Sequence, residues 1–516
     1  MLRACMRIMQ IVAVLLMATT TAPAEPGLPV GSLFAEPASV SLPPVVFSPR
    51  PGEVEETQTA MGVLRPGARD WVYLPVDVPA GVREIAVDYQ YDRPTVPPGE
   101  RGNALDIGIF DESGIGLGNA PGFRGWSGGF RTGFVISASD ATPGYLPGLV
   151  QEGRWHIILG PYSVAPQGLN WSVSITLRHG DPGPPFVPEY APESVPGRGR
   201  AWYRGDMHLH TVHSDGARLP EEVAAGARQA GLDFIISTEH NTSSAHAIWG
   251  RHATRDLLIL NGEEITTRNG HFLALGLPRS EWVDWRYRSD DDALSWFLSQ
   301  IHRDHALAVA AHPYCPFVGC SWKFGYHDFD AIEVWNGPWT LDDEVSLATW
   351  DNMLVASARN RQWIPALGNS DAHREPQVIG LPQSVVLASH LERGAILAGV
   401  KRGRLWVAES RAVDLSFTAS AQGRTAGIGE RLEVGEAELV TVALNVTGAP
   451  GAVVRLFTDQ GQIFQTVLPT SGPGTVTWTT KPRVSRYVRA EVRRLQDDPA
   501  LPTTMVAFTN PIFLGR

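Results

Sequence analysis

Residues 202–240 read WYRGDMHLHTVHSDGARLPEEVAAGARQAGLDFIISTEH, and they predict a strand, a helix and a second strand in succession. The runs at 202–210 and 232–240 have the length and apolar content of strands, and residues 219–231 have the pattern of a helix. This order is the repeating unit of α/β proteins. From the end of the first run onward, residues 208–216 concentrate three histidines and an aspartate in nine positions.

The same alternation continues over residues 201–405. A second helix-like segment, DDALSWFLSQIHRDH, lies at 291–305. Alternating strands and helices predict a parallel sheet or an α/β barrel. Including the two runs above, seven strand-like runs are present; the other five are LLILNGEEIT at 257–266, HFLALGL at 271–277, ALAVAAH at 306–312, DAIEVWNG at 330–337 and WIPALGNSDAH at 363–373.

The segments on either side of this region have the pattern of β-structure. Short alternating runs separated by Gly- and Pro-rich turns predict an N-terminal β-sandwich domain over 25–180. Residues 181–200, DPGPPFVPEYAPESVPGRGR, are dense in Pro and Gly and are predicted to be a linker. Strand-like runs return over 406–516 and predict a small C-terminal β-domain.

Residues 1–24 have the organisation of a secretory signal peptide. Arg3 and Arg7 precede an apolar run over 8–21 that is too short to span a membrane, and Ala22-Pro23-Ala24 gives a small-x-small cleavage pattern. We expect cleavage after Ala24 and export to the periplasm or the medium. An uncleaved anchor is the alternative.

Two cysteines, Cys315 and Cys320, remain after that cleavage. Their short spacing in an exported protein is compatible with a local disulfide. Two unlinked thiols are the alternative, because the sequence does not supply the distance between the two Cα atoms.

The overall charge narrows the range of partners. The chain of 516 residues has 43 Lys and Arg against 54 Asp and Glu, a formal net charge of −11. Duplex nucleic acid and anionic membranes are bound mainly by cationic surfaces, so neither is an expected partner. A small anionic substrate drawn to a local cationic site stays compatible with this charge.

Histidines are concentrated in the α/β region. Twelve of the fifteen lie between residues 208 and 373. His208 and His210 are two apart on an extended segment, so both rings lie on one face, and Asp371 and His373 repeat this spacing. Several of the histidines follow strand-like runs, which is where barrel enzymes place their catalytic groups. Imidazoles and carboxylates gathered there suit Zn²⁺, Mn²⁺ or Fe²⁺.

The motifs HLHTVHSDG, TEHN, GEEIT followed by GHFLALG, AHP and SDAH stand in the order of the PHP (polymerase and histidinol phosphatase) family, which the chain resembles. RGWSGGFRTGF, TPGYLPG and VAFTNPIFL outside this region are similar to the exported CehA/McbA-type branch of that family. The resemblance implies a distorted seven-stranded (β/α) barrel of PHP type over 201–405, and it implies three divalent metal ions.

The resemblance also implies which residues hold those ions. His208, His210, Glu264 and Asp371 are expected to bind the first ion, Glu264, His271 and His312 the second, and Asp215, His240 and His373 the third. Two positions leave a question open. Glu239 stands where many members have aspartate, and this difference could change a hydrogen bond behind the ligands. Glu263 neighbours Glu264, which is favoured because Ile-Thr follows it.

This chemistry predicts a hydrolase. Metal ions lower the pKa of bound water, and a pair of ions can hold a bridging hydroxide that attacks a phosphoester. Carboxylic ester, carbamate or amide hydrolysis at the same site is the alternative, since fold alone does not select a reaction. Three residues next to the ligands, His213, Asn336 and Arg374, are candidates for binding an anionic group or for protonating the leaving group.

Two other interpretations of the chain are weaker. Residues 125–129 match G-x-S-x-G, but the nucleophile elbow with that pattern needs a helix after it, and FRTGFVISAS reads as a strand. A non-catalytic extracytoplasmic protein, binding a glycan or a partner through its β-domains, would have no reason to keep the full ligand set. The sequence does not indicate the oligomeric state.

Overall fold

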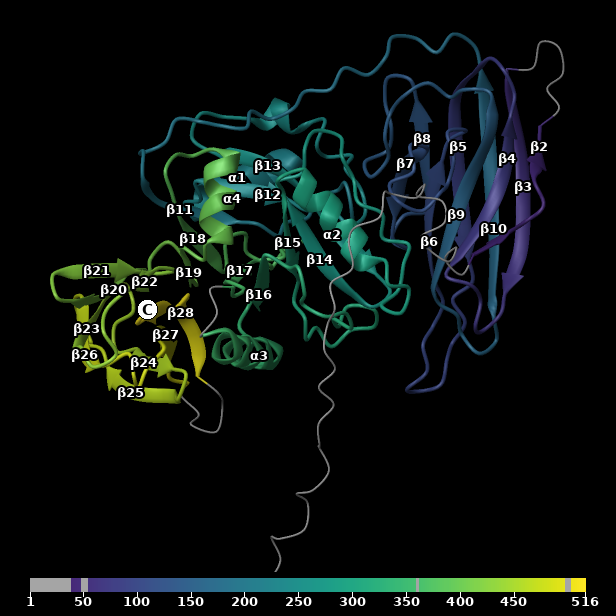
Figure 1. Cartoon of the computed structure of the whole chain (residues 1–516). Helices are drawn as coiled ribbons and strands as arrows, with labels where there is room; N and C mark the ends of the chain where they lie inside the picture. The colour runs from purple at the N-terminus through teal and green to yellow at the C-terminus, as the bar shows by residue number, and fades with distance from the viewer. Residues whose placement is uncertain (1–38, 48–53, 359–361, 497–502) are drawn as a thin grey trace, which may run out of the picture. The chain divides into compact units, whose positions relative to one another are not determined.

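The computed structural model describes residues 39–47, 54–358, 362–496 and 503–516. The expected signal peptide over 1–24 lies outside the described residues. The molecule is a mixed α/β protein with many strands, few helices and several separate sheets (Figure 1).

The N-terminal strands form two antiparallel-rich sheets that enclose one apolar core. One sheet has the order β1-β4-β9-β6-β7, with β2 beside β4, and the other has the order β3-β10-β5-β8. Strand β10 alternates buried and partly exposed side chains, as expected when one face of a sheet covers a core. The strands are β1 (Ser39–Ser41), β2 (Val45–Val46), β3 (Glu55–Leu64), β4 (Trp71–Val78), β5 (Val82–Tyr91), β6 (Ala104–Phe110), β7 (Phe123–Ser127), β8 (Gly133–Ser137), β9 (Gly153–Ser163) and β10 (Leu169–His179).

The strands of the α/β region follow one another through a continuous sheet in the order β17-β16-β15-β14-β13-β12-β11-β18-β19. The seven strand-like runs predicted from the sequence correspond to β11–β17. Their bounds are β11 (Ala201–Asp206), β12 (Phe234–Ser237), β13 (Leu258–Thr267), β14 (Gly270–Leu275), β15 (Leu307–Ala310), β16 (Ala331–Asn336) and β17 (Ala366–Asn369), followed by β18 (Gln383–Ala388) and β19 (Leu405–Ala408).

This sheet is not uniformly parallel. Strands β11, β12 and β13 pair in parallel, as do β15, β16 and β17, but β14 is antiparallel to both of its neighbours. The reason is local: only Arg268 and Asn269 connect β13 to β14, which is too short for a crossover. Between the two ends of the β11–β17 series, the described residues form one isolated bridge, Leu209 with Ala372. A closed seven-stranded barrel is therefore not confirmed.

Helices pack on this sheet beside the strands that they connect. Helix α1 (Pro220–Ala230) has Pro220 and two glutamates in its first turn and stops at Gly231, whose φ of 75° lies in the left-handed region that favours glycine. Helices α2, α3 and α4 pack against β15, β16 and β18 respectively (Figure 1). Their bounds are α2 (Leu294–Arg303), α3 (Leu341–Ser357) and α4 (Arg393–Lys401), and a short 3₁₀ turn, η2, spans Trp249–His252.

The C-terminal strands form a sheet of their own and also extend the sheet of the α/β region. Strands β21, β20, β23 and β26 make the separate sheet, while β28 pairs with β19 and continues the larger one through β27, β24 and β25. The predicted boundary at 405/406 therefore falls inside β19. The strands are β20 (Asp414–Ala421), β21 (Arg424–Gly427), β22 (Arg431–Leu432), β23 (Val440–Thr447), β24 (Val453–Thr458), β25 (Gly461–Val467), β26 (Gly474–Thr480), β27 (Tyr487–Arg494), β28 (Thr504–Thr509) and β29 (Ile512–Leu514).

The segment predicted to be a linker, 181–200, forms no helix or named strand, but it is not free of the α/β region. Ser194 bridges to Glu392, and the backbone N–H groups of Glu189 and Gly250 donate to the carbonyls of Ala247 and Glu189 respectively. Because these bonds are made by backbone groups, they fix the path of the segment along the α/β region.

Cys315 and Cys320 form a disulfide with a Cα–Cα distance of 5.6 Å. Of the two alternatives for these cysteines, a local disulfide and two unlinked thiols, the structure has the disulfide. It links two positions in the loop that follows β15.

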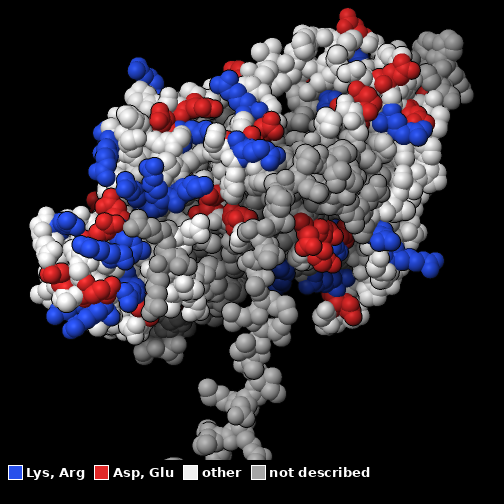
Figure 2. Space-filling view, viewed as in Figure 1, with Lys and Arg blue, Asp and Glu red and all other residues white. Residues whose placement is uncertain are grey.

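On the face in Figure 2, acidic and basic side chains of the described residues are interspersed. None of the described helices combines the length and the apolar character needed to cross a membrane.

Candidate metal centre

His208 and His210 lie in the extended segment that follows β11, and both rings point to one side, as their spacing predicts. Nε2 of His208 is 3.1 Å from Glu264 and 3.3 Å from Asp371. Nε2 of His210 is 3.2 Å from the same oxygen of Glu264 and 3.0 Å from the same oxygen of Asp371. These four side chains, predicted to bind the first ion, form one cluster.

Glu264 connects this cluster to the others. Its Oε2 lies 3.0 Å from Nδ1 of His240, and its Oε1 lies 2.8 Å from Nδ1 of His271 and 3.0 Å from Nε2 of His312. The neighbouring Glu263 points to the opposite face of β13, where its Oε2 accepts a hydrogen bond from the backbone N–H of Val283 at 2.8 Å. The choice of Glu264 over Glu263 is therefore the one that the geometry favours.

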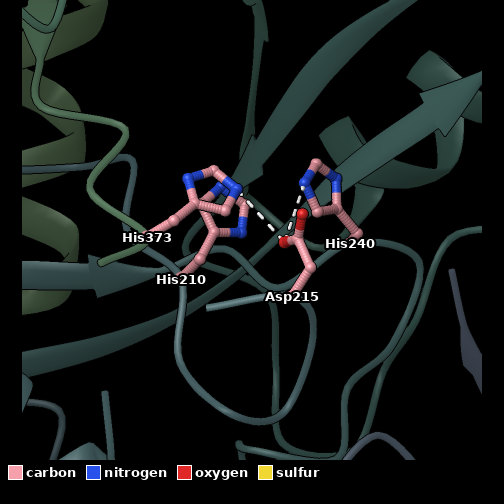
Figure 3. Close-up of side chains that lie close together, drawn as sticks. All are labelled: His210, Asp215, His240 and His373. Carbon is pink, nitrogen blue, oxygen red and sulfur yellow. Dashed lines mark ion pairs between the residues drawn. The ribbon is translucent and has the colours of Figure 1, made fainter. Parts of the chain in front are cut away.

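Asp215 lies close to the imidazoles of a third set of residues. Its Oδ1 lies 3.1 Å from Nε2 of His373 and 3.5 Å from Nε2 of His240, and the carboxylate points between the two rings (Figure 3). His210 belongs to this cluster as well as to the first. The set predicted for the third ion is thus also brought together.

The second predicted set, Glu264, His271 and His312, has one additional neighbour. Sγ of Cys320 lies 3.5 Å from Nδ1 of His312. Because this sulfur is part of the disulfide, it is not available as a thiolate ligand.

Several donor atoms of the nine side chains are buried and form no hydrogen bond. Six atoms are buried and have no hydrogen-bond partner: His208 Nε2, His210 Nε2, His271 Nε2, Asp215 Oδ1, Glu264 Oε2 and Asp371 Oδ1. Buried polar atoms are normally satisfied, and the exceptions need a cause. Imidazole nitrogens and carboxylate oxygens are the ligands of Zn²⁺, Mn²⁺ and Fe²⁺, so the donor set fits divalent metal ions.

The carboxylates of this cluster are ionised. Burial opposes the ionisation of Glu264, but the imidazoles of His240, His208 and His271 outweigh it and hold its pKa well below the ordinary value. The imidazoles of His208, His373 and His210 lower the pKa of Asp371 in the same way.

Two of the ligand positions adopt unusual backbone conformations. The φ angles of Asp371 and His312 are 48° and 24°, in the region that side chains other than glycine rarely adopt, and Asn241, next to His240, has a φ of 52°. Such conformations persist where the surrounding structure imposes them, and they concentrate at functional sites.

Glu333, which the sequence analysis did not single out, orients His208. Its side chain is fully buried in β16, and Nδ1 of His208 lies 3.1 Å from its Oε1. The same carboxylate accepts hydrogen bonds from Asn369 Nδ2 at 2.8 Å and from the backbone N–H of His312 at 3.0 Å. The available signal was a charged residue inside the otherwise apolar run AIEVW, because a buried carboxylate needs partners.

Replacing Glu333 by Gln is expected to weaken zinc binding by about 10- to 100-fold, since a carboxylate on the far nitrogen of a ligating imidazole fixes its orientation and raises its basicity. Competition with a chromogenic chelator measures the affinity. Asp330→Asn is the matched control. Asp330 comes immediately before the first residue of β16, and its carboxylate pairs with His302 at 2.8 Å. Equal zinc affinity of Glu333→Gln and the wild-type protein would contradict the role of Glu333.

Glu239, the residue that differs from the family pattern, holds the loop after His210. Its carboxylate accepts hydrogen bonds from the backbone N–H of Thr211 at 3.1 Å and from the hydroxyls of Thr211 and Ser214 at 2.6 and 2.5 Å. Ser214 Oγ in turn lies 3.3 Å from Nδ1 of His210. Glu239 therefore acts on this ligand through Ser214.

The three candidate catalytic residues have different surroundings. Asn336 donates from Nδ2 to Asp371 at 3.3 Å, and Arg374 donates from Nη2 to the backbone carbonyl of Asp215 at 2.8 Å. His213 is not brought to the cluster: its Nδ1 lies 2.9 Å from Ser244 Oγ, and it lines a different cavity. The cause is the turn at 212–215, which turns residue 213 away from the face of His210 and Asp215.

A cavity of about 370 Å³ opens next to the cluster. Asp215, His240, His271 and Arg374 line it from the α/β region. The N-terminal sandwich contributes aromatic side chains and a carboxylate to the other walls: Trp71, Asp106, Trp126, Phe130 and Tyr162.

Burial raises the pKa of Asp106 to about 6. Because this pKa is higher in the folded than in the unfolded chain, stability should fall as the pH rises from about 4 to about 6. Asp106→Asn removes this effect, so its stability relative to the wild-type protein should improve by up to about 3 kcal/mol between pH 4 and pH 7. Urea unfolding of both proteins across this range measures the difference, and a difference that does not change with pH would contradict the burial effect.

Comparison of the sequence with protein-family models gives no match, and no curated protein matches it. Solved structures similar to the chain include a two-domain protein from Bacteroides vulgatus, described as containing a predicted PHP-like metal-dependent phosphoesterase. The two sequences are 18% identical, the match covers 63% of this chain and 99% of that one, and the TM-score is 0.33. An amidohydrolase from Chromobacterium violaceum has 20% identity, coverage of 34% and 89%, and a TM-score of 0.24. A periplasmic inhibitor of g-type lysozyme from Aeromonas hydrophila has 11% identity, coverage of 27% and 100%, and a TM-score of 0.17.

Proposed function

We propose that this protein is a metal-dependent hydrolase of the PHP family, in its exported CehA/McbA-type branch, with three divalent ions, Zn, Mn or Fe, in its α/β region. The observation that carries the proposal is a set of six buried donor atoms that form no hydrogen bond and that belong to six of the nine expected ligand side chains. Five sequence motifs in the order of the family support the assignment.

The ligand sets are those that the resemblance implies, and the clusters support them. His208, His210, Glu264 and Asp371 would hold one ion, and Asp215, His240 and His373 would hold a third. Glu264, whose Oε1 lies 2.8 Å from His271 and 3.0 Å from His312, would hold a second ion with these two histidines. Divalent ions held there would supply Lewis acidity towards the scissile group and would lower the pKa of a water molecule that attacks it.

Other side chains would position the ligands and the substrate. The amide of Asn336 donates to both Asp371 and Glu333, at 3.3 and 3.0 Å, and so holds the first carboxylate in place. Arg374 lies at the cavity and is exposed, so its guanidinium is available to an anionic substrate group. The assignment of His213 to catalysis has no geometric support, because its ring faces Ser244.

Phosphoesters are the substrates that we favour. Besides the cationic cluster, the cavity contains two guanidinium groups, Arg268 and Arg374, which suit an anionic substrate. A carboxylic ester, carbamate or amide substrate is the second candidate, favoured by the aromatic walls of the same cavity. Neither candidate requires duplex nucleic acid or a membrane as a partner.

We also propose that the protein is exported, with cleavage after Ala24, to the periplasm or the medium. The disulfide between Cys315 and Cys320 supports this, since disulfides persist in oxidising compartments. We keep the domain limits proposed from the sequence, a sandwich over 25–180 and β-structure over 406–516. Strands β1–β10 support the first and β20–β29 the second, while β19 spans the boundary at 405/406.

A substrate panel with defined metals tests the function. The metal-free protein is reloaded with zinc, manganese or ferrous iron and assayed with aryl phosphomonoesters, phosphodiesters, aryl carboxylic esters and carbamates. We expect turnover of a phosphoester that a chelator abolishes. Turnover of carbamates or carboxylic esters alone would replace our first candidate by the second. A protein that binds no metal and hydrolyses none of them would contradict the hydrolase assignment.

A further inference from the structure

The guanidinium of Arg268 lies in the same cavity as the metal cluster and has no hydrogen bond or ion pair with any described residue. Its Nε and Nη2 are buried, and both lack a partner. A buried guanidinium is costly unless an anion compensates it. Among the buried arginines with which it can be compared, Arg286 is paired with Asp284 at 2.6 Å and Arg489 with Glu491 at 2.6 Å.

Aromatic rings hold Arg268 in place. Its guanidinium carbon lies 5.0 Å from the ring centroid of Trp71 and 4.6 Å from that of Tyr162, so two residues of the N-terminal sandwich flank it. Cation–π contacts of this kind position a guanidinium without using its hydrogen-bond donors. The donors therefore stay available to another group.

The charged groups near Arg268 form no ion pair with it among the described residues. Asp106 attracts it electrostatically but makes no ion pair with it, and Asp106 Oδ1 instead accepts a hydrogen bond from the backbone N–H of Gly129 at 2.9 Å. Asp70 is engaged with Arg288, whose Nη2 donates to it at 2.6 Å. The cavity thus contains a cation whose nearby carboxylates are held by other groups.

Aromatic rings form a large part of the cavity wall besides Arg268 and the metal donors. The indole and phenyl rings are those of Trp71, Trp126, Phe130 and Trp285, and polar side chains such as Asp106, Asn241 and Thr266 also line the cavity. Offset or edge contacts with such rings favour a planar aromatic body. A volume of about 370 Å³ is within the range of cavities that bind small organic molecules.

We infer that the substrate is an aromatic compound with a second anionic group, remote from the bond that is cleaved, and that Arg268 binds this group. The inference rests on the proposed function for the position of the cleaved bond, but the binding of the anion by Arg268 does not. Arg268 is thus a specificity-determining residue, and the N-terminal sandwich contributes to substrate selection through Trp71 and Tyr162.

Binding to the metal-free protein tests the inference without any turnover. Benzoate and its neutral analogue benzamide are titrated while the fluorescence of the cavity tryptophans is followed. We expect benzoate to bind about 10- to 100-fold more tightly than benzamide, because its carboxylate can form a charge-assisted hydrogen bond with the guanidinium and the neutral amide cannot. Arg268→Gln should lose this preference and Arg268→Lys should keep part of it. Arg288→Gln, which removes a neighbouring arginine paired with Asp70, should leave it unchanged.

Equal binding of benzoate and benzamide by the wild-type protein, or an undiminished preference in Arg268→Gln, would overturn the inference. A second arm compares kcat/KM for 4-carboxyphenyl phosphate and phenyl phosphate in the metal-loaded enzyme. Turnover without preference for the carboxylated ester would overturn the inference and leave the hydrolase intact. Selective benzoate binding that depends on Arg268, without turnover of any ester, would support the anion site and contradict the hydrolase.

Discussion

The Glu264→Gln variant is expected to lose most of its bound metal, and its kcat/KM should fall by at least about a thousand-fold. Elemental analysis measures the metal content, and an assay with the best substrate of the panel measures kcat/KM. The two oxygens of Glu264 lie within 3.2 Å of five imidazoles, so one carboxylate belongs to the first two donor sets and also contacts His240 of the third. An amide has one weaker acceptor oxygen and no charge. Several kcal/mol of transition-state stabilisation depend on ions held in this way.

Glu263→Gln provides the matched control. The two glutamates are adjacent in β13, but Glu263 faces away from the imidazoles, and burial raises its pKa well above the ordinary value. A protonated carboxyl is close in shape and charge to an amide, so this variant should keep its metal content and activity. Full metal content in Glu264→Gln, or equal losses in the two variants, would contradict the bridging position of Glu264.

Glu491→Ala is expected to lower the free energy of unfolding by about 3–5 kcal/mol, because it removes the carboxylate shared by two buried arginines. Glu491 accepts from Arg489 at 2.6 Å and from Arg493 at 2.7 Å, and its side chain is 1% exposed. The two arginines also contact Asp351 and Glu344 of α3, so the network joins β27 to that helix. Urea unfolding measures the loss.

The destabilisation caused by Glu491→Ala is compared with that caused by breaking the exposed ion pair of Arg494 and Glu409 in the same region. Arg494→Ala breaks an ion pair whose arginine is half exposed, and exposed pairs contribute at most about 1 kcal/mol. If Glu491→Ala were no more destabilising than Arg494→Ala, the buried network would not hold β27 and α3 together as described.

The strand and helix pattern of residues 202–240 predicted β11, α1 and β12 because each element there has a strong local signal. Spacing also predicted the shared face of His208 and His210, since side chains two apart in an extended segment lie on the same side. The same rule does not extend to His213, which follows in a turn. Its ring therefore lies against Ser244, away from the cluster.

Features that depend on distant or unusual pairing were not predicted. The antiparallel position of β14 follows from the two-residue connection before Gly270, and Asn269-Gly270 is a hairpin signal that the α/β interpretation passed over. The pairing of β28 with β19 joins segments about a hundred residues apart, which periodicity does not reveal. The role of Glu333 depends on His208, Asn369 and His312 meeting around one carboxylate.

Anomalous diffraction from crystals of the zinc-loaded protein, collected on both sides of the zinc absorption edge, tests the central claim most directly. We predict anomalous peaks inside the three donor groups, with Glu264 next to at least two of them. Peaks only at surface histidines, or no peak among these nine side chains, would contradict it.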